Sequence, residues 1–460
     1  MILAHGLGGR TDLPLPIWMF SYGAALTLLA SFAALAAFWP TARLEGGTGE
    51  LTLARADSRV VRGLAIVIRL VGVAALALVL VAAAVGENSS QANLAPAAVY
   101  IVFWVGMLFV SGFVGDLWRV LSPFDTLVAI FRRRRHGSPP ETSAAEPAGH
   151  GSSAGEAAGG HDVVDHDEPD SGYWPATVGL LGFVWVELVY PERASPRALF
   201  GLLAAYTVVM LACAARRGRG WLRRGDAFAA LFGVVAHIAP LHRADDGRLR
   251  LRPPFVGLAS LEWRPGLEEL VLIALGSTTF DGLTRTQLWV DLTGDLDRLG
   301  SVVAGTAGLV LAIAVVAIAY FLAMGVAARR VDHRSDAEEL RAAFVHSLVP
   351  IVLAYAVAHY FSLLVLEGQS SIALISDPLG RGWDLFGTAG RPVDFTLVSP
   401  LAVAYVQCAA IVVGHVAGVV LAHDRALALF DKRLATRSQH PLLVTMVLFT
   451  VGGLFLLLGG

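Results

Sequence analysis

Long apolar runs, separated by shorter polar stretches, divide the chain into segments of membrane-spanning length. A helix needs about 20 apolar residues to cross about 30 Å of hydrocarbon. Nine segments meet this requirement: 17 to 39, 64 to 86, 94 to 117, 174 to 190, 198 to 215, 302 to 326, 344 to 367, 400 to 422 and 441 to 459. The pattern predicts an all-α fold, a polytopic transmembrane helical bundle. No basic region precedes the first segment, so we expect it to be retained rather than cleaved as a signal peptide.

Two shorter apolar stretches, 226 to 241 and 269 to 288, are interpreted from the distribution of positive charge. Cytoplasmic loops of membrane proteins carry an excess of Lys and Arg. Arginines cluster after the first, third and fifth segments, in the connection 242 to 267, and after residue 326. Strict alternation then requires 269 to 288 to cross and 226 to 241 to be re-entrant or interfacial. The sequence therefore predicts about ten crossings of a bacterial plasma membrane, with the N-terminus and C-terminus outside.

One long polar segment, 132 to 172, begins with arginines and continues with Gly, Ser, Ala, Pro and acidic residues. It has no apolar period, so it cannot bury enough surface to fold. We expect a disordered cytoplasmic linker. It would join transmembrane helices 1 to 3 (residues 1–131) to helices 4 to 10 with the re-entrant segment (residues 173–460).

Composition agrees with this reading. Hydrophobic residues make up 55% of the chain, charged residues 16%, and the mean hydropathy is +0.63, whereas soluble domains contain about 25% charged residues. The net charge of -2 gives no indication of a nucleic-acid partner. The expected partners are the lipid bilayer and a small-molecule substrate or solute, and the oligomeric state does not follow from the sequence.

Ionisable side chains within the spans are candidates for function because they are costly to insert. One group falls in the outer half of the membrane. Glu187, Asp281 and His359 are its candidate catalytic residues, and Tyr355 and Gln407 are candidate substrate-binding residues. Carboxylates and imidazoles at one depth can relay protons or bind a divalent metal. The candidate metal ligands are His5, His359 and Asp281. The structural alternative is that these residues cap helix ends or hydrogen-bond neighbouring helices.

A second group lies deeper, toward the cytoplasm. Arg69 and Asp116 are expected to form an ion pair, with a substrate-binding role as the alternative. His415 lies between Gly414 and Gly418. That Gly-x-x-x-Gly spacing lets another helix approach closely, so His415 should face protein, where it is a further candidate for substrate binding.

The predicted crossing 269 to 288 is poor as a continuous helix. Small and polar residues interrupt it from Gly276 to Gly282. Broken helices at membrane depth are tolerated where they line a cavity or are buried in protein. A break at 276 to 282 favours a secondary transporter or permease.

Several short motifs carry a resemblance to a known group of proteins. They include His5 to Arg10, Gly115 to Arg119, Ser277 to Gly282, His346 to Pro350, Ala358 to Tyr360, Ser376 to Gly380, and Ala422 to Asp424. Together they resemble actinobacterial multi-pass membrane proteins, some of which carry the name fenitrothion hydrolase. The resemblance spans nearly the whole chain except the linker. It implies hydrolysis of an organophosphate-type ester at the membrane.

Two functions therefore stand side by side: a membrane-embedded hydrolase, with or without metal assistance, and a secondary transporter. The sequence contains no Walker A loop, dinucleotide fingerprint, His-Glu-x-x-His or Gly-x-Ser-x-Gly motif, which argues against ATP-driven pumping and against the motif-defined hydrolases. A third reading, a non-catalytic assembly or sensor protein, would make the polar residues packing contacts only.

Overall fold

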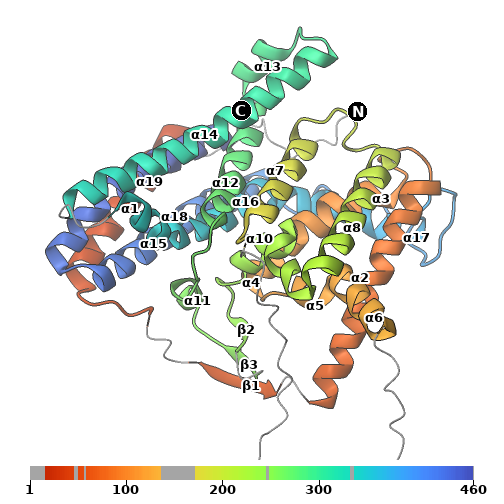
Figure 1. Ribbon diagram of the computed structural model, residues 1–460. Helices are drawn as coiled ribbons and strands as arrows, with labels where there is room; N and C mark the ends of the chain where they lie inside the picture. Colours follow the sequence, from red (N-terminus) through yellow and green to blue (C-terminus); the bar gives the residue numbers. More distant parts are fainter. Residues whose placement is uncertain are drawn as a thin grey trace, which may run out of the picture.

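The structure is a computed structural model that describes residues 16–45, 50–55, 58–135, 171–244, 248–331 and 336–458. Helices dominate it (Figure 1). The first part of the chain contains α1 (Ile17–Phe38), β1 (Leu51–Arg55), α2 (Arg59–Val85), α3 (Leu94–Pro96), the π-helix η1 (Ala97–Gly106), α4 (Met107–Phe113), α5 (Trp118–Leu121) and α6 (Pro123–Arg135). The predicted linker lies almost entirely outside the described residues.

The second part of the chain follows the same pattern. It contains α7 (Trp174–Leu188), α8 (Pro196–Arg217), η2 (Arg219–Trp221), α9 (Leu222–Gly225), α10 (Ala227–Val235), β2 (Leu241–Arg243), β3 (Arg248–Leu251), α11 (Val256–Ala259), α12 (Leu267–Thr284), α13 (Gln287–Thr293) and α14 (Arg298–Arg330). The last elements are α15 (Ala337–Phe344), η3 (Val345–Leu348), α16 (Val349–Ser362), the π-helix η4 (Leu363–Glu367), α17 (Gly368–Ser376), α18 (Pro400–Leu429) and α19 (Lys432–Leu458).

Eight of the described helical segments are long and apolar enough to cross a membrane. The fifteen-residue α7 and the eighteen-residue α12 occupy two further predicted crossings. The all-α prediction is confirmed, and the apolar helices are those expected of an integral membrane protein.

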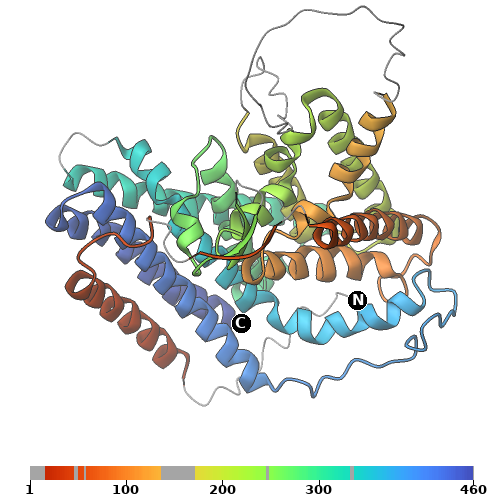
Figure 2. The ribbon, with the colours of Figure 1, turned by 90° about the horizontal axis from the view of Figure 1, so that it is seen from below.

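The helices before and after the predicted linker pack against one another. Helix α1 lies along α18 and α19 (Figure 2), while α2 packs against α8. Asp424 of α18 fixes the chain that follows α1, since its carboxylate accepts hydrogen bonds from Trp39 Nε1 (2.9 Å), Arg43 N (2.6 Å) and Leu44 N (3.0 Å). One apolar core therefore draws on both parts of the sequence.

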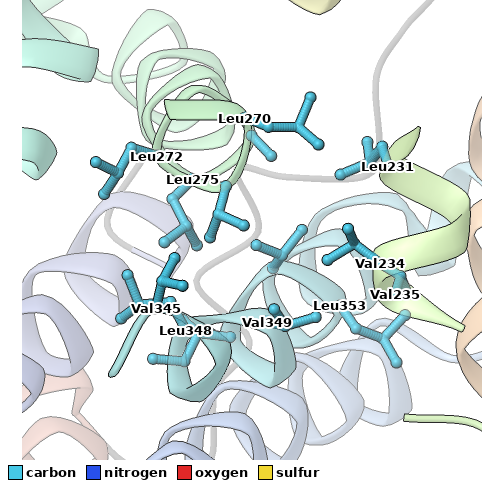
Figure 3. Close-up of a cluster of buried hydrophobic side chains, with 14 of the residues drawn as sticks. Leu231, Val234, Val235, Leu270, Leu272, Leu275, Val345, Leu348, Val349 and Leu353 are labelled. Atoms are coloured by element: carbon cyan, nitrogen blue, oxygen red, sulfur yellow. The ribbon is translucent and has the colours of Figure 1, made fainter. Parts of the chain in front are cut away.

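Three helices meet at the centre of this core. Leu231 and Val235 of α10, Leu270 and Leu275 of α12, and Leu353 of α16 point toward one another (Figure 3). All five are buried. Because lipid tails are as apolar as these side chains, the contact stabilises the bundle chiefly through close van der Waals packing.

Small residues bring α16 and α18 unusually close together. A Cβ atom at Gly414 would lie 2.1 Å from Ala354 Cβ, and one at Gly418 would lie 2.8 Å from Ser347 O. His415, between the two glycines, is buried. The prediction of close helix approach at the Gly-x-x-x-Gly motif is confirmed.

A small antiparallel sheet, which the sequence analysis did not predict, joins two of the arginine-rich loops. Its strand order is β1-β3-β2. Glu50, just before β1, accepts from Arg250 Nη1 of β3 (2.7 Å), and His242 Nε2 of β2 lies 3.0 Å from its other oxygen. The hydrogen bond from Arg250 holds the pKa of Glu50 below its usual value. Apolar and polar residues do alternate in Leu51 to Leu53 and in Arg248 to Leu251, but strands of three to five residues are too short to stand out within arginine-rich loops.

Loops that were predicted to lie on one side of the membrane contact one another. The sheet joins two loops expected inside. On the opposite face, Glu87 N donates to Leu379 O (2.8 Å) and Leu94 N donates to Pro378 O (3.2 Å). This grouping agrees with the alternation of the predicted crossings. Which face lies outside stays a prediction.

Helix α12 is continuous, so the predicted break at 276 to 282 is wrong. The hydroxyls that suggested the break are bonded within the helix: Ser277 and Thr278 donate to Ala274 O (3.1 and 2.8 Å), and Thr279 donates to Leu275 O (2.9 Å). Such back-bonding satisfies the polar groups without unwinding the backbone. Gly276 serves close packing instead, because a Cβ there would lie 2.5 Å from Ile313 Cα of α14.

The glycine contact between α16 and α18 gives a stability prediction. Replacing Gly414 with Leu should lower the free energy of unfolding by about 1–3 kcal/mol, because the new side chain overlaps Ala354. Gly201→Leu on α8 is the matched control, since a Cβ at Gly201 meets no atom within 4 Å. Equilibrium unfolding in bicelles measures both variants. Equal losses for the two would contradict the contact.

Candidate functional site

The centre of the candidate site is the carboxylate of Asp281, which is buried within the helix bundle. Its Oδ2 atom lies 2.5 Å from His359 Nε2, 3.4 Å from the Tyr360 hydroxyl and 3.6 Å from Arg285 Nη2. A hydrogen-bonded histidine and a nearby cation compensate a buried negative charge, which would otherwise be costly. The site is therefore a polar cluster inside an apolar protein.

Two helices supply this cluster, and their local structure explains the geometry. Asp281 and Arg285 are four residues apart on α12, one turn along the same face. His359 and Tyr360 lie near the end of α16, immediately before the π-helix η4. A second π-helix, η1, contacts η4. Short π-helical stretches occur frequently at functional sites, and here two of them lie next to the cluster.

Glu187, near the end of α7, joins the cluster from a third helix. Its carboxyl lies beside the Tyr360 hydroxyl and within electrostatic reach of Asp281. Tyr100 of η1 lies within electrostatic reach of Glu187 and donates a hydrogen bond to Arg193 O (2.9 Å). The structure thus brings together Glu187, Asp281 and His359, which the sequence had singled out at one depth.

Tyr360 and Arg285 belong to this cluster but were missed by the sequence analysis. Tyr360 is adjacent to His359 in the chain, and Arg285 follows Asp281 by one helical turn. Their closeness in sequence to His359 and Asp281 was the signal that could have identified them. Arg285 lies just beyond the polar stretch 276 to 282, and tyrosines are common near membrane interfaces, so neither residue stood out.

His359 separates the cluster from a cavity of about 350 Å³. Its ring lines the cavity together with residues of α12, α14, α18 and α19 and with Tyr355 of its own helix. Nε2 faces Asp281, while Nδ1 makes no hydrogen bond to any described residue. A neutral imidazole that donates its Nε2 hydrogen to Asp281 keeps a lone pair on Nδ1. A carboxylate that orients a histidine in this way is the arrangement of a general base in hydrolases.

Of three further candidate substrate-binding residues, Tyr355, His415 and Gln407, one lines the cavity and two do not. Tyr355 lines it, and its hydroxyl donates to Phe449 O of α19 (2.9 Å). His415 lies behind Tyr355 with ring centroids 5.9 Å apart, and its Nδ1 is 2.9 Å from Ile411 O of its own helix. Gln407 is half-buried on α18, and its amide makes no hydrogen bond within the described part of the chain. The structure therefore favours only Tyr355 as a substrate contact.

The predicted ion pair between Arg69 and Asp116 is wrong. Asp116 accepts from Arg119 N within its own turn (3.1 Å), lies near Arg223, and has its Oδ2 near Gly233 of α10. Arg69 lies on α2, and its Nε finds no hydrogen-bond partner among the described residues. The carboxylate of Asp116 is instead engaged by the backbone of its own turn after α4. Neither residue contacts the cluster around Asp281.

A metal at this site was a sequence prediction, and the geometry does not fit it. His359 Nε2 and Asp281 Oδ2 bond directly at 2.5 Å, which leaves no room for an ion with ligand distances of about 2.0–2.2 Å. No three His, Cys, Asp or Glu side chains in the described ranges could hold a metal together. His5 lies outside the described residues. The metal stays a prediction, which the direct contact between His359 and Asp281 does not support.

Comparison with known proteins adds no relative to this description: no family model, no curated protein and no solved structure matches the chain.

The buried pair can be tested by a double-mutant cycle. Asp281→Asn and His359→Gln, singly and together, should reveal a coupling energy of about 1–3 kcal/mol, because both groups are shielded from water. The control is the exposed pair Arg298–Glu192, at 2.7 Å, which should couple by less than about 1 kcal/mol. Unfolding in bicelles provides the free energies. Similar coupling in the two pairs would argue that His359 and Asp281 are not in buried contact.

Proposed function

We propose that this protein is a membrane-embedded hydrolase of uncharged esters, in which His359 and Asp281 act as a general-base dyad. One observation carries the proposal: the ring of His359, which bonds Asp281 through Nε2, lines an apolar cavity, and its Nδ1 makes no hydrogen bond to any described residue. The resemblance to proteins named fenitrothion hydrolase points to organophosphate-type triesters as the substrate class.

The proposed reaction begins when His359 Nδ1 accepts a proton from a water molecule. The water oxygen attacks the phosphorus atom, the bond to the leaving oxygen breaks, and the imidazolium returns its proton to that leaving group. Asp281 stabilises the transient positive charge of the imidazolium across the short hydrogen bond. General-base catalysis of this kind contributes about 10²–10⁴-fold to the rate. Arg285 Nη2 lies 3.6 Å from the same carboxylate oxygen and provides a compensating positive charge.

A second candidate function, a proton-coupled secondary transporter, is favoured by one separate observation. Glu187, Tyr360, Asp281 and His359 form a chain of protonatable groups from the end of α7 to the cavity. Such chains relay protons in pumps and transporters. The continuous α12 removes the broken helix that first suggested transport, so the hydrolase is the favoured proposal.

The proposed topology has ten crossings, with α10 re-entrant. The nine residues of α10 span only about 14 Å. Asp226 caps the start of α10 by accepting from Phe228 N (3.1 Å), and Arg252 Nη2 approaches the carbonyls of Ala236 and His237 just beyond its end (3.2 Å each). The chain then continues directly into β2 of the sheet that contains the arginine-rich strands. We place that sheet in the cytoplasm and both termini outside a bacterial plasma membrane.

The dyad makes a prediction for turnover. With purified protein in nanodiscs and a lipid-soluble phosphotriester, His359→Gln and Asp281→Asn should each lower kcat by about 100-fold or more, because each removes one member of the general base. His237→Gln is the control: this histidine bonds a backbone carbonyl, Gly233 O, at 2.9 Å rather than a carboxylate, and it lies outside the cavity lining. Release of the phenol leaving group is followed by absorbance.

Wild-type rates of ester hydrolysis in both His359→Gln and Asp281→Asn would contradict the proposed hydrolase mechanism. If wild-type protein hydrolyses no ester, and reconstituted vesicles acidify with a solute in a manner that depends on Glu187, the transporter becomes the better account.

Elemental analysis provides a separate check on the metal. We expect well under one divalent ion per chain in the purified protein, and turnover that is unchanged by a chelator, because His359 and Asp281 bond each other directly. A stoichiometric metal that disappears in His359→Ala would contradict the general-base assignment and indicate a metal-assisted reaction.

A further inference from the structure

We infer that the cavity beside His359 opens sideways into the bilayer between α14 and α19, and that its ligand is an uncharged, lipid-soluble molecule taken from the membrane. The class of ligand, an ester, rests on the proposed function, whereas the entry route from the bilayer rests on different residues. It specifies how the substrate arrives and which class of substrate fits.

The opening is marked by cavity-lining residues that are exposed at the protein surface. Val315 of α14 is 50% exposed and Leu448 of α19 is 67% exposed, although both line the cavity. Gly452, one turn beyond Leu448, also lines it, and a Cβ at that position would meet no atom within 4 Å. The cavity therefore reaches the surface where these two helices face outward.

That surface is the one expected to contact lipid. Along α14, large apolar side chains on the same side as Val315, such as Leu311 and Leu322, are exposed, and α19 presents Val444 and Phe455. Both helices are long and apolar enough to cross a membrane. The mouth of the cavity is thus continuous with the bilayer-facing surface, so its nearest reservoir is hydrocarbon rather than water.

The interior of the cavity selects against charge. Its walls are mainly apolar side chains, and the hydroxyls of Thr278, Thr279 and Tyr355 already donate to backbone carbonyls. A charged ligand would lose its hydration without gaining an ionic partner on the lining. Only the His359 ring offers an unbonded nitrogen. A neutral ester satisfies these conditions, whereas an ionised phosphodiester product does not and should leave.

Size and shape narrow the ligand further. Binding pockets for small molecules commonly range over about 300–1,000 Å³, so a volume near 350 Å³ suits a compact molecule. Gly453 sets the floor, because a Cβ there would lie 2.0 Å from the Tyr355 hydroxyl. Gly452 leaves the mouth open. The pair of glycines on α19 therefore shapes both the depth of the cavity and its access to lipid.

The test uses an uncharged, diazirine-bearing apolar ester, photolysed with the protein in nanodiscs and mapped by peptide mass spectrometry. Wild-type protein should be labelled around Val315 and Leu448. Gly452→Trp should lower that labelling at least tenfold by filling the mouth. Gly201→Trp is the control, because Gly201 is also an exposed helical glycine with free space around it. Val315→Trp closes the mouth from the opposite helix, which guards against misfolding of a single variant.

The outcomes separate this inference from the proposed function. His359→Gln should keep wild-type labelling while losing turnover, because the mouth lies apart from the dyad. Unchanged labelling in both tryptophan variants would overturn the lateral route, as would equal labelling by a sulfonated, membrane-impermeant version of the probe added in water. A lipid acyl chain that holds the site against a large excess of probe would also overturn it. Labelling at the mouth without hydrolysis of any ester would overturn the hydrolase and leave the lateral route standing.

Discussion

The contact between Asp281 and His359 is the interaction on which the rest of the site depends. A carboxylate buried in a membrane bundle must be paired or neutralised, since the surrounding apolar medium does not solvate its charge. His359 meets this need through a 2.5 Å hydrogen bond, and Arg285 and Tyr360 approach the same oxygen. Because these partners come from α12 and α16, the pair also fixes how the two helices face each other. The direction of the free nitrogen of His359 follows from that arrangement.

Helix irregularity and small residues build the surroundings of this pair. The π-helices η1 and η4 contact each other beside the cluster, where Glu187 lies within electrostatic reach of Tyr100 on η1 and of Tyr360 just before η4. Glycines let neighbouring helices approach closely. Gly414 and Gly418 allow α18 to pack against α16 and the preceding η3, and Gly453 leaves space for the Tyr355 hydroxyl. The close packing at Ala354 gives way, one turn further along α16, to the cavity lined by Ala358 and His359.

The sequence predicted the helices well because membrane crossing imposes a length and a composition that each segment must meet alone. It also identified Glu187, Asp281 and His359, since charge at membrane depth is rare. Prediction from the sequence failed where a polar side chain had a choice between two hydrogen-bond partners. The hydroxyls of Ser277 to Thr279 could have signalled a break or back-bonding, and the structure shows back-bonding. Asp116 could pair with Arg69 or with its own turn, and the nearer donor, Arg119 N, prevails.

Contacts between distant segments were harder still to predict. Nothing in the sequence around Glu50 identifies Arg250, two hundred residues away, as its partner, and strands of three to five residues are too short to reveal a sheet. Tyr360 and Arg285 were likewise overlooked, because their roles depend on how α12 and α16 are rotated about their axes. The cavity and its opening between α14 and α19 arise only from the packed bundle.

The most direct test of the account is the protonation of the His359 ring. Solid-state NMR of ¹⁵N-histidine-labelled protein in bilayers, with the His359 signals assigned by their loss in His359→Gln, reports which nitrogen carries hydrogen. The account predicts a neutral ring with hydrogen on Nε2, bonded to Asp281, and a bare Nδ1. A ring protonated on Nδ1, whether as the other neutral tautomer or as an imidazolium, would contradict the general-base dyad.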